Sequence, residues 1–296
     1  MEFKSAFVAI VGRPNAGKST ILNSFVGEKL AAISSKPQTT RTKITGIITE
    51  DDYQLVFVDT PGVHLPKTRL GDYMNKSAMG AINGVDAAVL TVDAARDPGA
   101  AEEKIVSELR AQKVPTILAV NKIDKVAYEA LLPLIDTYSK MMDFETVIPV
   151  SATKGDGMDK LFDEIKKHLV PGPMFYPEDM ITDKTEREIA AEILREKLLR
   201  LLEQEIPHGI AVEIEEMKDE ENIIKISANI FCEKSSHKAI VIGKKGDMLK
   251  KIGTYAREDM EKFFGKKIFL QLWVKIRDDW RNNNFMLKNM GFSGKE

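Results

Sequence analysis

Residues 12–19 are Gly12-Arg13-Pro14-Asn15-Ala16-Gly17-Lys18-Ser19, the pattern G-x-x-x-x-G-K-S, and Thr20 follows them. The apolar run 6–11 before this stretch predicts a buried strand, and the pattern of 18–27 predicts a helix. A glycine-rich loop between a strand and a helix is the setting in which backbone N–H groups enclose phosphates. We therefore predict a phosphate-binding loop, in which Lys18 reaches the β- and γ-phosphates and the Ser19 hydroxyl holds Mg²⁺. A glycine-rich turn without a ligand is the alternative.

The first part of the chain alternates between short apolar runs and helical patterns. Because strands that alternate with helices form parallel sheets covered on both faces, we predict an α/β domain with a mainly parallel sheet. Ligands of such sheets bind beyond the carboxyl ends of the strands. The predicted strands are 6–11, 44–49, 55–58, 87–92, 116–120 and 147–150, and the predicted helices are 18–27, 70–81, 100–111, 128–141 and 158–168.

Length and composition indicate two domains. A chain of 296 residues is long enough for about two domains, and the proline-rich stretch after residue 170 predicts a linker. The single cysteine, Cys232, fits a reducing compartment, and no apolar run reaches the ~18 residues of a membrane span. We expect a cytoplasmic protein. The predicted parts are a nucleotide-binding domain at 1–170, a linker at 171–182 and a second domain at 183–296.

Three further motifs follow apolar runs, so each is expected at the carboxyl end of a strand. Asp59 can hold the shell of Mg²⁺, and the Gly62 N–H can meet the γ-phosphate. Asp124 can accept hydrogen bonds from N1–H and N2–H₂ of guanine, a donor pair that adenine lacks. The Lys122 stem can cover the base, and the Ala152 N–H can meet guanine O6. These motifs are Asp59-Thr60-Pro61-Gly62 with Val63 after it, Asn121-Lys122-Ile123-Asp124, and Ser151-Ala152-Thr153.

The order and spacing of these motifs resemble the translation-factor-like class of small GTPases. The resemblance implies GTP and GDP as ligands together with Mg²⁺, and it makes the loop 38–41 the first switch. Thr40 is then the second hydroxyl on the metal, beside Ser19 and Asp59, with Thr39 as the alternative. An ordinary polar loop, or another enzyme with a phosphate-binding loop, is the other interpretation.

The usual catalytic glutamine is absent from the sequence. Many GTPases place glutamine directly after D-x-x-G to orient the attacking water, whereas this chain has Val63 there. We therefore expect slow intrinsic hydrolysis or an added group. Asn15 resembles the asparagine that ligates K⁺ in related GTPases, and the alternative is that it only shapes the loop. The residues predicted to act in catalysis are Lys18, Thr40, Gly62 and Asn15.

The second part of the chain combines a G-x-x-G loop with a basic patch. Residues 234–267 include ten basic and four acidic side chains, a net charge of +6. The predicted order helix–strand–strand–helix–helix–strand matches the type II KH domain, an α+β fold whose G-x-x-G loop clamps about four nucleotides. A lysine-rich turn is the alternative. We expect Trp273, Trp280 and Phe231 in the core. The residues predicted to bind RNA are Ile242, Gly243, Lys244, Lys245, Gly246, Lys250 and Lys251.

The motifs of both parts together resemble the Era family of bacterial GTPases over nearly the whole chain. The resemblance implies a factor that binds the 3′ region of 16S ribosomal RNA, assists 30S subunit assembly and associates with the inner face of the membrane. We expect a monomer in which GTP orders the loops at Thr40 and Gly62 and so controls RNA binding at Lys244 and Lys245. A constitutive RNA-binding scaffold with a structural nucleotide, and a GTPase switch acting on a protein, are the alternatives.

Overall fold

The computed structural model describes residues 2–34, 36, 39–64, 66–203 and 206–292. The chain divides into two compact units, of which the first is built mainly from residues up to Asp183 and the second mainly from Lys184 onward. Gln38 of the predicted switch loop and the last four residues of the predicted second domain lie outside the described residues. The exact domain bounds given above stay a prediction.

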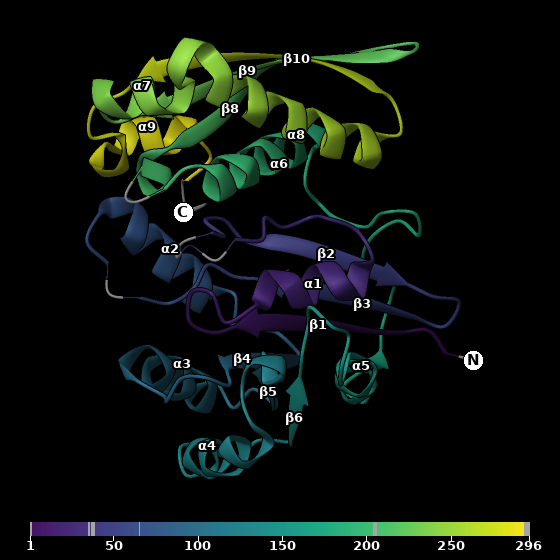
Figure 1. Cartoon of the computed structure of the whole chain (residues 1–296). Helices are drawn as coiled ribbons and strands as arrows, with labels where there is room; N and C mark the ends of the chain where they lie inside the picture. The colour runs from purple at the N-terminus through teal and green to yellow at the C-terminus, as the bar shows by residue number, and fades with distance from the viewer. Residues whose placement is uncertain (1, 35, 37–38, 65, 204–205, 293–296) are drawn as a thin grey trace. The chain divides into compact units, whose positions relative to one another are not determined.

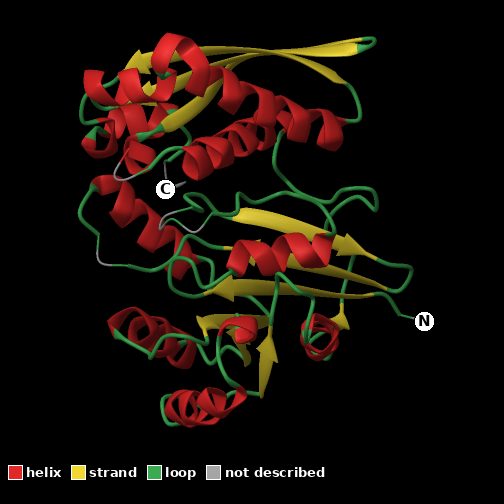
Figure 2. Cartoon of the chain, viewed as in Figure 1, coloured by secondary structure: helices red, strands yellow, loops and turns green. Residues whose placement is uncertain are grey.

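The first unit contains a mixed sheet, whose strands are drawn in yellow in Figure 2. The strand order is β2-β3-β1-β4-β5-β6, and β7 pairs with β1. All neighbours along this path are parallel except β2 and β3, which are antiparallel, as are β1 and β7. The predicted mainly parallel sheet is therefore confirmed. The strands are β1 (Lys4–Val11), β2 (Ile44–Thr49), β3 (Tyr53–Asp59), β4 (Ala87–Asp93), β5 (Thr116–Asn121), β6 (Thr146–Val150) and β7 (Val170–Pro171).

Helices pack against this sheet and bury its central strands. Every residue of β5 is buried, and so are the first six residues of β4, as expected for strands covered on both faces. Beyond the strands' carboxyl ends lie the loops that contain the sequence motifs. The helices are α1 (Lys18–Val26), α2 (Arg69–Gly80), α3 (Ala100–Ala111), α4 (Leu131–Ser139) and α5 (Met158–Lys166), with short 3₁₀ turns at Ile123–Lys125 and Tyr128–Ala130.

The proline-rich stretch after β7 runs beside β2 and β3 within the first unit. The fully buried Gln54 side chain accepts hydrogen bonds from the N–H groups of Phe175 (2.8 Å) and Tyr176 (3.0 Å), and it donates to the Tyr176 carbonyl (2.9 Å). The Thr182 hydroxyl donates to the Thr45 carbonyl at 2.6 Å. These bonds explain why the first unit extends to the end of this stretch.

The second unit has the predicted order helix–strand–strand–helix–helix–strand, and a further short helix at Asn284–Asn289, which the sequence did not predict, follows it (Figure 1). Its three-stranded sheet has the order β10-β9-β8, with β8 antiparallel and β10 parallel to β9. The first helix begins at a capping box, in which the Thr185 hydroxyl accepts from the Glu188 N–H. The elements are α6 (Glu186–Leu201), β8 (Ala211–Glu220), β9 (Ile223–Cys232), α7 (Ser235–Ile242), α8 (Asp247–Phe264), β10 (Lys267–Ile276) and α9 (Asn284–Asn289), with 3₁₀ turns at Ile206–Gly209, Lys244–Gly246 and Trp280–Asn282.

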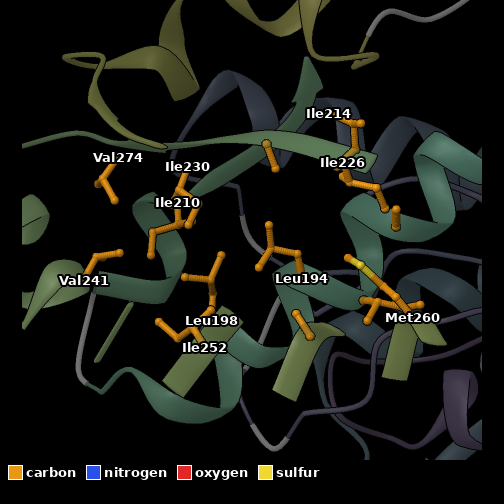
Figure 3. Packing of buried hydrophobic residues seen from close by; sticks show 14 of the residues in the cluster. Leu194, Leu198, Ile210, Ile214, Ile226, Ile230, Val241, Ile252, Met260 and Val274 are labelled. Atoms are coloured by element: carbon orange, nitrogen blue, oxygen red, sulfur yellow. The ribbon is translucent and has the colours of Figure 1, made fainter. Parts of the chain in front are cut away.

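One face of this sheet forms the core of the second unit together with the helices. Leu194 and Leu198 of α6, Ile226 and Ile230 of β9 and Ile252 of α8 belong to one hydrophobic cluster. Figure 3 shows Leu198 beside Ile252. All five side chains are at most 1% exposed, so burial of this apolar face is the main source of stability in the unit.

The aromatic side chains of this unit divide between the core and the surface. Trp280 is fully buried, and its indole N–H donates to the Gly209 carbonyl at 3.0 Å. Phe231 is also buried, so both predictions are confirmed, but the prediction for Trp273 was wrong because this side chain is 56% exposed. Side chains alternate along β10, and Trp273 lies on the same face as the half-exposed Phe269, opposite the buried Ile268.

Among the helices of the described residues, none combines the length and the apolar character needed to cross a membrane.

Candidate functional site

The loop between β1 and α1 has a backbone that its glycines make possible. Gly12 has a φ of 151°, and a Cβ atom there would lie 2.3 Å from the Thr91 carbonyl oxygen. Gly17 has a φ of 104°, and a Cβ atom there would lie 2.0 Å from Nδ2 of Asn121. Asn15 adopts a positive φ of 64° without being glycine. The close approach of neighbouring strands and loops therefore explains both glycines of the motif.

Lys18 lies at the start of α1 and is buried under the loop. Its ammonium donates to the carbonyl oxygens of Gly12 (3.2 Å) and Arg13 (3.0 Å). Burial lowers the pKa of Lys18 to about 8, although the nearby Asp59 carboxylate acts in the opposite direction. Two neutral carbonyls compensate a buried cation poorly, so an anionic ligand would stabilise its charged form.

Three oxygen-bearing side chains converge beside this lysine. The Ser19 hydroxyl donates to Asp59 Oδ2 at 2.7 Å and lies 2.8 Å from the Thr40 hydroxyl, which is itself 3.4 Å from Oδ2. Burial raises the pKa of Asp59 to about 6, despite the lowering effects of Lys18 and the two hydroxyls. The second carboxylate oxygen, Oδ1, is buried and has no hydrogen-bond partner among the described residues.

This cluster fits a small divalent cation. Mg²⁺ prefers oxygen ligands and is commonly held by one carboxylate with hydroxyls and phosphates, and an unpartnered buried Oδ1 is the kind of atom a cation would satisfy. Of the two candidate threonines, the structure brings Thr40 to Ser19 and Asp59. Thr39 instead donates its hydroxyl to the Lys36 carbonyl at 2.6 Å.

The residues after Asp59 pack directly against the phosphate-binding loop. A Cβ atom on Gly62 would lie 2.4 Å from the Pro14 nitrogen, and the Val63 N–H donates to the Gly12 carbonyl at 3.3 Å. Thr60 has a structural contact, because its buried hydroxyl donates to the Ile10 carbonyl at 3.0 Å. Pro61 is buried as well. The Val63 side chain is 2% exposed and belongs to a hydrophobic cluster, so it offers no polar group to a water molecule.

Asn121 connects three of the motif loops. Its side-chain amide donates to the Ala16 carbonyl at 2.8 Å, and its Oδ1 accepts from the N–H groups of Lys122 (2.8 Å) and Ala152 (3.1 Å). The phosphate loop, the end of β5 and the end of β6 are thus joined through one buried amide. The Ala152 N–H, predicted to meet guanine O6, is directed to Asn121 in this structure.

Asp124 and Ser151 form the open end of the site. The Ser151 hydroxyl donates to Asp124 Oδ1 at 2.6 Å, and this hydrogen bond lowers the pKa of the exposed carboxyl. The Thr153 hydroxyl lies 3.4 Å from that of Ser151. Ile123 precedes Asp124 in a 3₁₀ turn and packs against the hydrophobic cluster. A carboxylate fixed in its ionised form is suited to accept from two N–H donors.

The sequence did not indicate the partner of Lys122. Its ammonium donates to the Asn15 carbonyl at 2.5 Å and to Asp93 Oδ2 at 2.6 Å. Burial raises the pKa of Asp93, but the bonds from Lys122 and the Ala95 N–H outweigh it, so the pKa is lowered overall. Asp93 directly follows the apolar run 87–92 at the end of β4. This position at the carboxyl end of a strand was the feature of the sequence that could have identified it as a site residue.

A second partner missed from the sequence is Glu102. The side chain of Arg13, predicted to bind nucleotide, pairs with Glu102 at the start of α3. The same carboxylate accepts from the Gly99 N–H at 3.1 Å. Glu102 is nearly buried, with a side chain 5% exposed, whereas that of Arg13 is 26% exposed. The pair ties the phosphate loop to α3.

In the second unit, the G-x-x-G loop joins α7 to α8 in a conformation that favours glycine. Gly243, Lys245 and Gly246 have φ values of 76°, 54° and 86°. A Cβ atom on Gly243 would lie 2.7 Å from the Met248 Cβ. The predicted RNA-binding lysines, which are Lys244, Lys245, Lys250 and Lys251, are all exposed, and Ile242 is partly exposed beside them. The loop therefore presents a tight backbone and four cations to the solvent.

Comparison with known proteins gives a consistent result for both units. Residues 7–122 match the family described as 50S ribosome-binding GTPase, and residues 205–281 match the KH domain. GTPase Era of Ruminiclostridium cellulolyticum is 50% identical over 293 residues, which cover 99% of this chain and 98% of that protein. The chain belongs to the Era family. GTPase Era of Clostridium botulinum strain Okra is 52% identical and covers 98% of each chain.

Solved structures of Era share this fold over the whole chain. An Era variant from Aquifex aeolicus bound to GDP and AlF4⁻ superposes with a TM-score of 0.94 at 38% identity, covering 99% of this chain and all of that one. Era in complex with MgGDPNP and nucleotides 1506–1542 of 16S ribosomal RNA gives the same TM-score, identity and coverage. As a member of the Era family, the protein is a GTPase with a C-terminal KH domain.

Proposed function

We propose that this Era-family GTPase is a nucleotide-controlled switch that binds the 3′ region of 16S ribosomal RNA and assists assembly of the 30S subunit. The observation that supports this most is that the predicted nucleotide-binding motifs meet around the phosphate loop, while the same chain also has an exposed G-x-x-G loop. Era in complex with MgGDPNP and an rRNA fragment has the same fold, and the two sites of this chain suit these two kinds of ligand.

The first unit would bind GTP or GDP through the phosphate loop and hold Mg²⁺ at the oxygen cluster. Ser19, Thr40 and Asp59 would ligate the metal, directly or through water, and the metal would neutralise charge on the β- and γ-phosphates. Lys18 regains a favourable environment when its ammonium meets phosphate oxygens. The Gly62 N–H, which packs at the phosphate loop, would face the γ-phosphate.

Selection of guanine would rest on Asp124. Guanine offers N1–H and N2–H₂ to one carboxylate, whereas adenine would leave that carboxylate without its second donor. The Ser151 hydroxyl holds the carboxylate at 2.6 Å, and the Lys122 stem would cover the base. Asp124→Asn should therefore reduce the affinity for GDP and relax the discrimination against xanthine nucleotides, measured by competition with a fluorescent nucleotide.

Hydrolysis would be slow in the isolated protein, because Val63 is buried in an apolar cluster. We propose that K⁺ beside Asn15 supplies positive charge to the β- and γ-phosphates, in the role that an arginine finger has elsewhere. The rate of GTP hydrolysis should then be higher in KCl than in NaCl at equal ionic strength, and Asn15→Ala should remove the difference. Equal rates in the two salts would leave Asn15 with only a structural role.

RNA would bind at the G-x-x-G loop. The exposed Lys244 and Lys245 would meet phosphates, while the tight backbone at Gly243 allows the RNA to approach closely. Changing both lysines to glutamate should abolish binding of a 16S 3′-terminal oligonucleotide. Lys262→Glu serves as the matched control, because Lys262 is an exposed lysine near the other end of α8.

The same oligonucleotide tests the switch. It should bind more tightly with GDPNP than with GDP, because GTP-ordered loops and RNA binding are reciprocally linked. Equal affinities with both nucleotides would favour a constitutive RNA-binding scaffold. If the variant with both Lys244 and Lys245 changed to glutamate keeps full RNA affinity, this loop is not the RNA site, and a switch that acts on a protein is favoured.

We also propose that the protein is a monomer of the cytoplasm that associates peripherally with the inner face of the membrane, as the family resemblance implies. Light scattering at micromolar concentration tests the monomer. Co-sedimentation with vesicles containing anionic lipid tests the membrane association, with nucleotide-loaded protein alone as the control.

A further inference from the structure

Asn75 makes a two-point contact with the backbone of His64. The Asn75 side chain lies in the middle of α2 and is 7% exposed. Its amide nitrogen donates to the His64 carbonyl at 2.6 Å, and its Oδ1 accepts from the His64 N–H at 3.2 Å. One side chain therefore satisfies both backbone polar groups of a residue that belongs to no helix or strand.

The phosphate loop also contacts the segment 62–64. Gly62 packs on Pro14 so closely that a Cβ atom would overlap its backbone, and the Val63 N–H donates to the Gly12 carbonyl at 3.3 Å. The ring nitrogen Nδ1 of His64 lies 3.0 Å from the Gly62 carbonyl, which links the two ends of the segment.

The helix that carries Asn75 is anchored in the core of the first unit. Met74 and Ala78 of α2 are fully buried, so α2 cannot turn without disturbing that packing. A cavity of about 580 Å³ lies between α2 and α3, lined in part by Val63, His64 and Asn75. The hydrogen bonds between Asn75 and the His64 backbone therefore lie at the wall of this cavity and connect α2 to the segment 62–64.

We propose that Asn75 is a positioning residue for GTP hydrolysis. Its amide fixes the His64 peptide and, through the segment 62–64, the Gly62 N–H, so that α2 and the loop facing the γ-phosphate move as one body. GDP has no γ-phosphate and needs no such alignment, so the contact acts on the GTP-bound state. This inference rests on the role proposed above for the Gly62 N–H.

The test uses Asn75→Asp in the full chain. A carboxylate has nearly the same shape and still accepts from the His64 N–H, but it cannot donate to the His64 carbonyl and repels it. The affinity for GDPNP should fall about tenfold, which corresponds to about 1.4 kcal/mol, while the affinity for GDP stays within about twofold. The rate of GTP hydrolysis at saturating substrate should also fall about tenfold. Asn83→Asp, an exposed residue just after α2, is the charge-matched control.

The ratio of GDPNP to GDP affinity separates positioning from a merely structural role. If Asn75→Asp weakens both nucleotides equally, or neither, the inference is wrong. Thermal unfolding with GDP bound verifies that the Asn75→Asp variant is folded. If that variant is unfolded, Asn75→Ser, which also loses the two-point contact, is used in its place. Gly62→Ala tests the underlying role separately. If this variant loses no GDPNP affinity relative to GDP, the proposed γ-phosphate contact fails. A selective loss of GDPNP affinity, together with an unaffected Asn75→Asp, refutes only the positioning role.

Discussion

The affinity for GDP should fall as the pH rises above 8, because Lys18 then loses its charge. Burial lowers the pKa of this lysine from 10.5 to about 8, and its ammonium is held by two neutral carbonyls, those of Gly12 and Arg13. Phosphate oxygens attract the charged form, so binding raises the pKa of the bound lysine above that of the free protein. The affinity is therefore level below pH 8 and decreases as the pH passes through 8.

The size of the effect follows from the linkage between proton and nucleotide binding. At pH 9, one unit above the pKa of the free protein, about one Lys18 side chain in ten is charged, so the affinity should be about tenfold lower than at pH 7. This corresponds to about 1.4 kcal/mol. Asp59 does not interfere, since burial raises its pKa only to about 6, and its carboxyl is ionised over this range.

The assay is a titration with a fluorescent GDP analogue in excess Mg²⁺ at pH 7 to 9, at constant ionic strength. Lys18→Arg should bind more weakly but with little pH dependence, because a guanidinium keeps its proton. Lys18→Ala shows whatever pH dependence comes from the nucleotide itself. A level profile for the unaltered protein, or an equally steep one for Lys18→Arg, would refute the reasoning.

Three further predictions follow from packing and charge. Trp280→Ala should destabilise the protein by about 3–5 kcal/mol, whereas Trp273→Ala should change stability by less than about 0.5 kcal/mol, because of these two side chains Trp280 alone is fully buried. Urea unfolding measures both free-energy changes, and similar values would contradict the placement of Trp280 in the core and Trp273 on the surface. Gly243→Ala should weaken binding of the 16S oligonucleotide about tenfold, since residue 243 has a positive φ and a Cβ atom there would lie 2.7 Å from the Met248 Cβ. Fluorescence anisotropy measures the affinity, and an unchanged value would argue against a tight contact between this backbone and the RNA. A double-mutant cycle of Arg13→Ala and Glu102→Gln, measured by urea unfolding with GDP bound, should give a coupling energy of about 1 kcal/mol. This value is at the lower end for contacting residues because the Arg13 side chain is 26% exposed. If the effects of the two substitutions simply add, the ion pair contributes nothing to stability.

The sequence predicted the order of the main elements in both units, since strand and helix periodicities differ and the motif glycines mark the turns, but it did not predict β7 and α9. The phosphate loop, the Asp59 motif and the Asn121 motif each follow a strand of the parallel sheet, as their apolar flanks indicated. The prediction for Trp273 failed because alternation along a strand places aromatic residues on either face, and the sequence does not say which face the helices cover. The roles of the individual site residues stay predictions.

The sequence by itself determined what kind of loop forms at Gly12–Ser19, because backbone freedom at glycine and the charge of Lys18 are local properties. Only the tertiary structure decided which side chains meet around that loop. Arg13 pairs with Glu102, 89 positions away, and Lys122 pairs with Asp93, 29 positions away. Asn75 reaches the His64 backbone across 11 positions. Such contacts depend on how strands are ordered in the sheet and how helices pack on it, and many residues of suitable charge or polarity could satisfy the same local pattern. The physical reason is that hydrogen bonds and ion pairs act over a few ångströms in space. The folded chain sets the distance between two side chains, and their separation along the sequence does not set it.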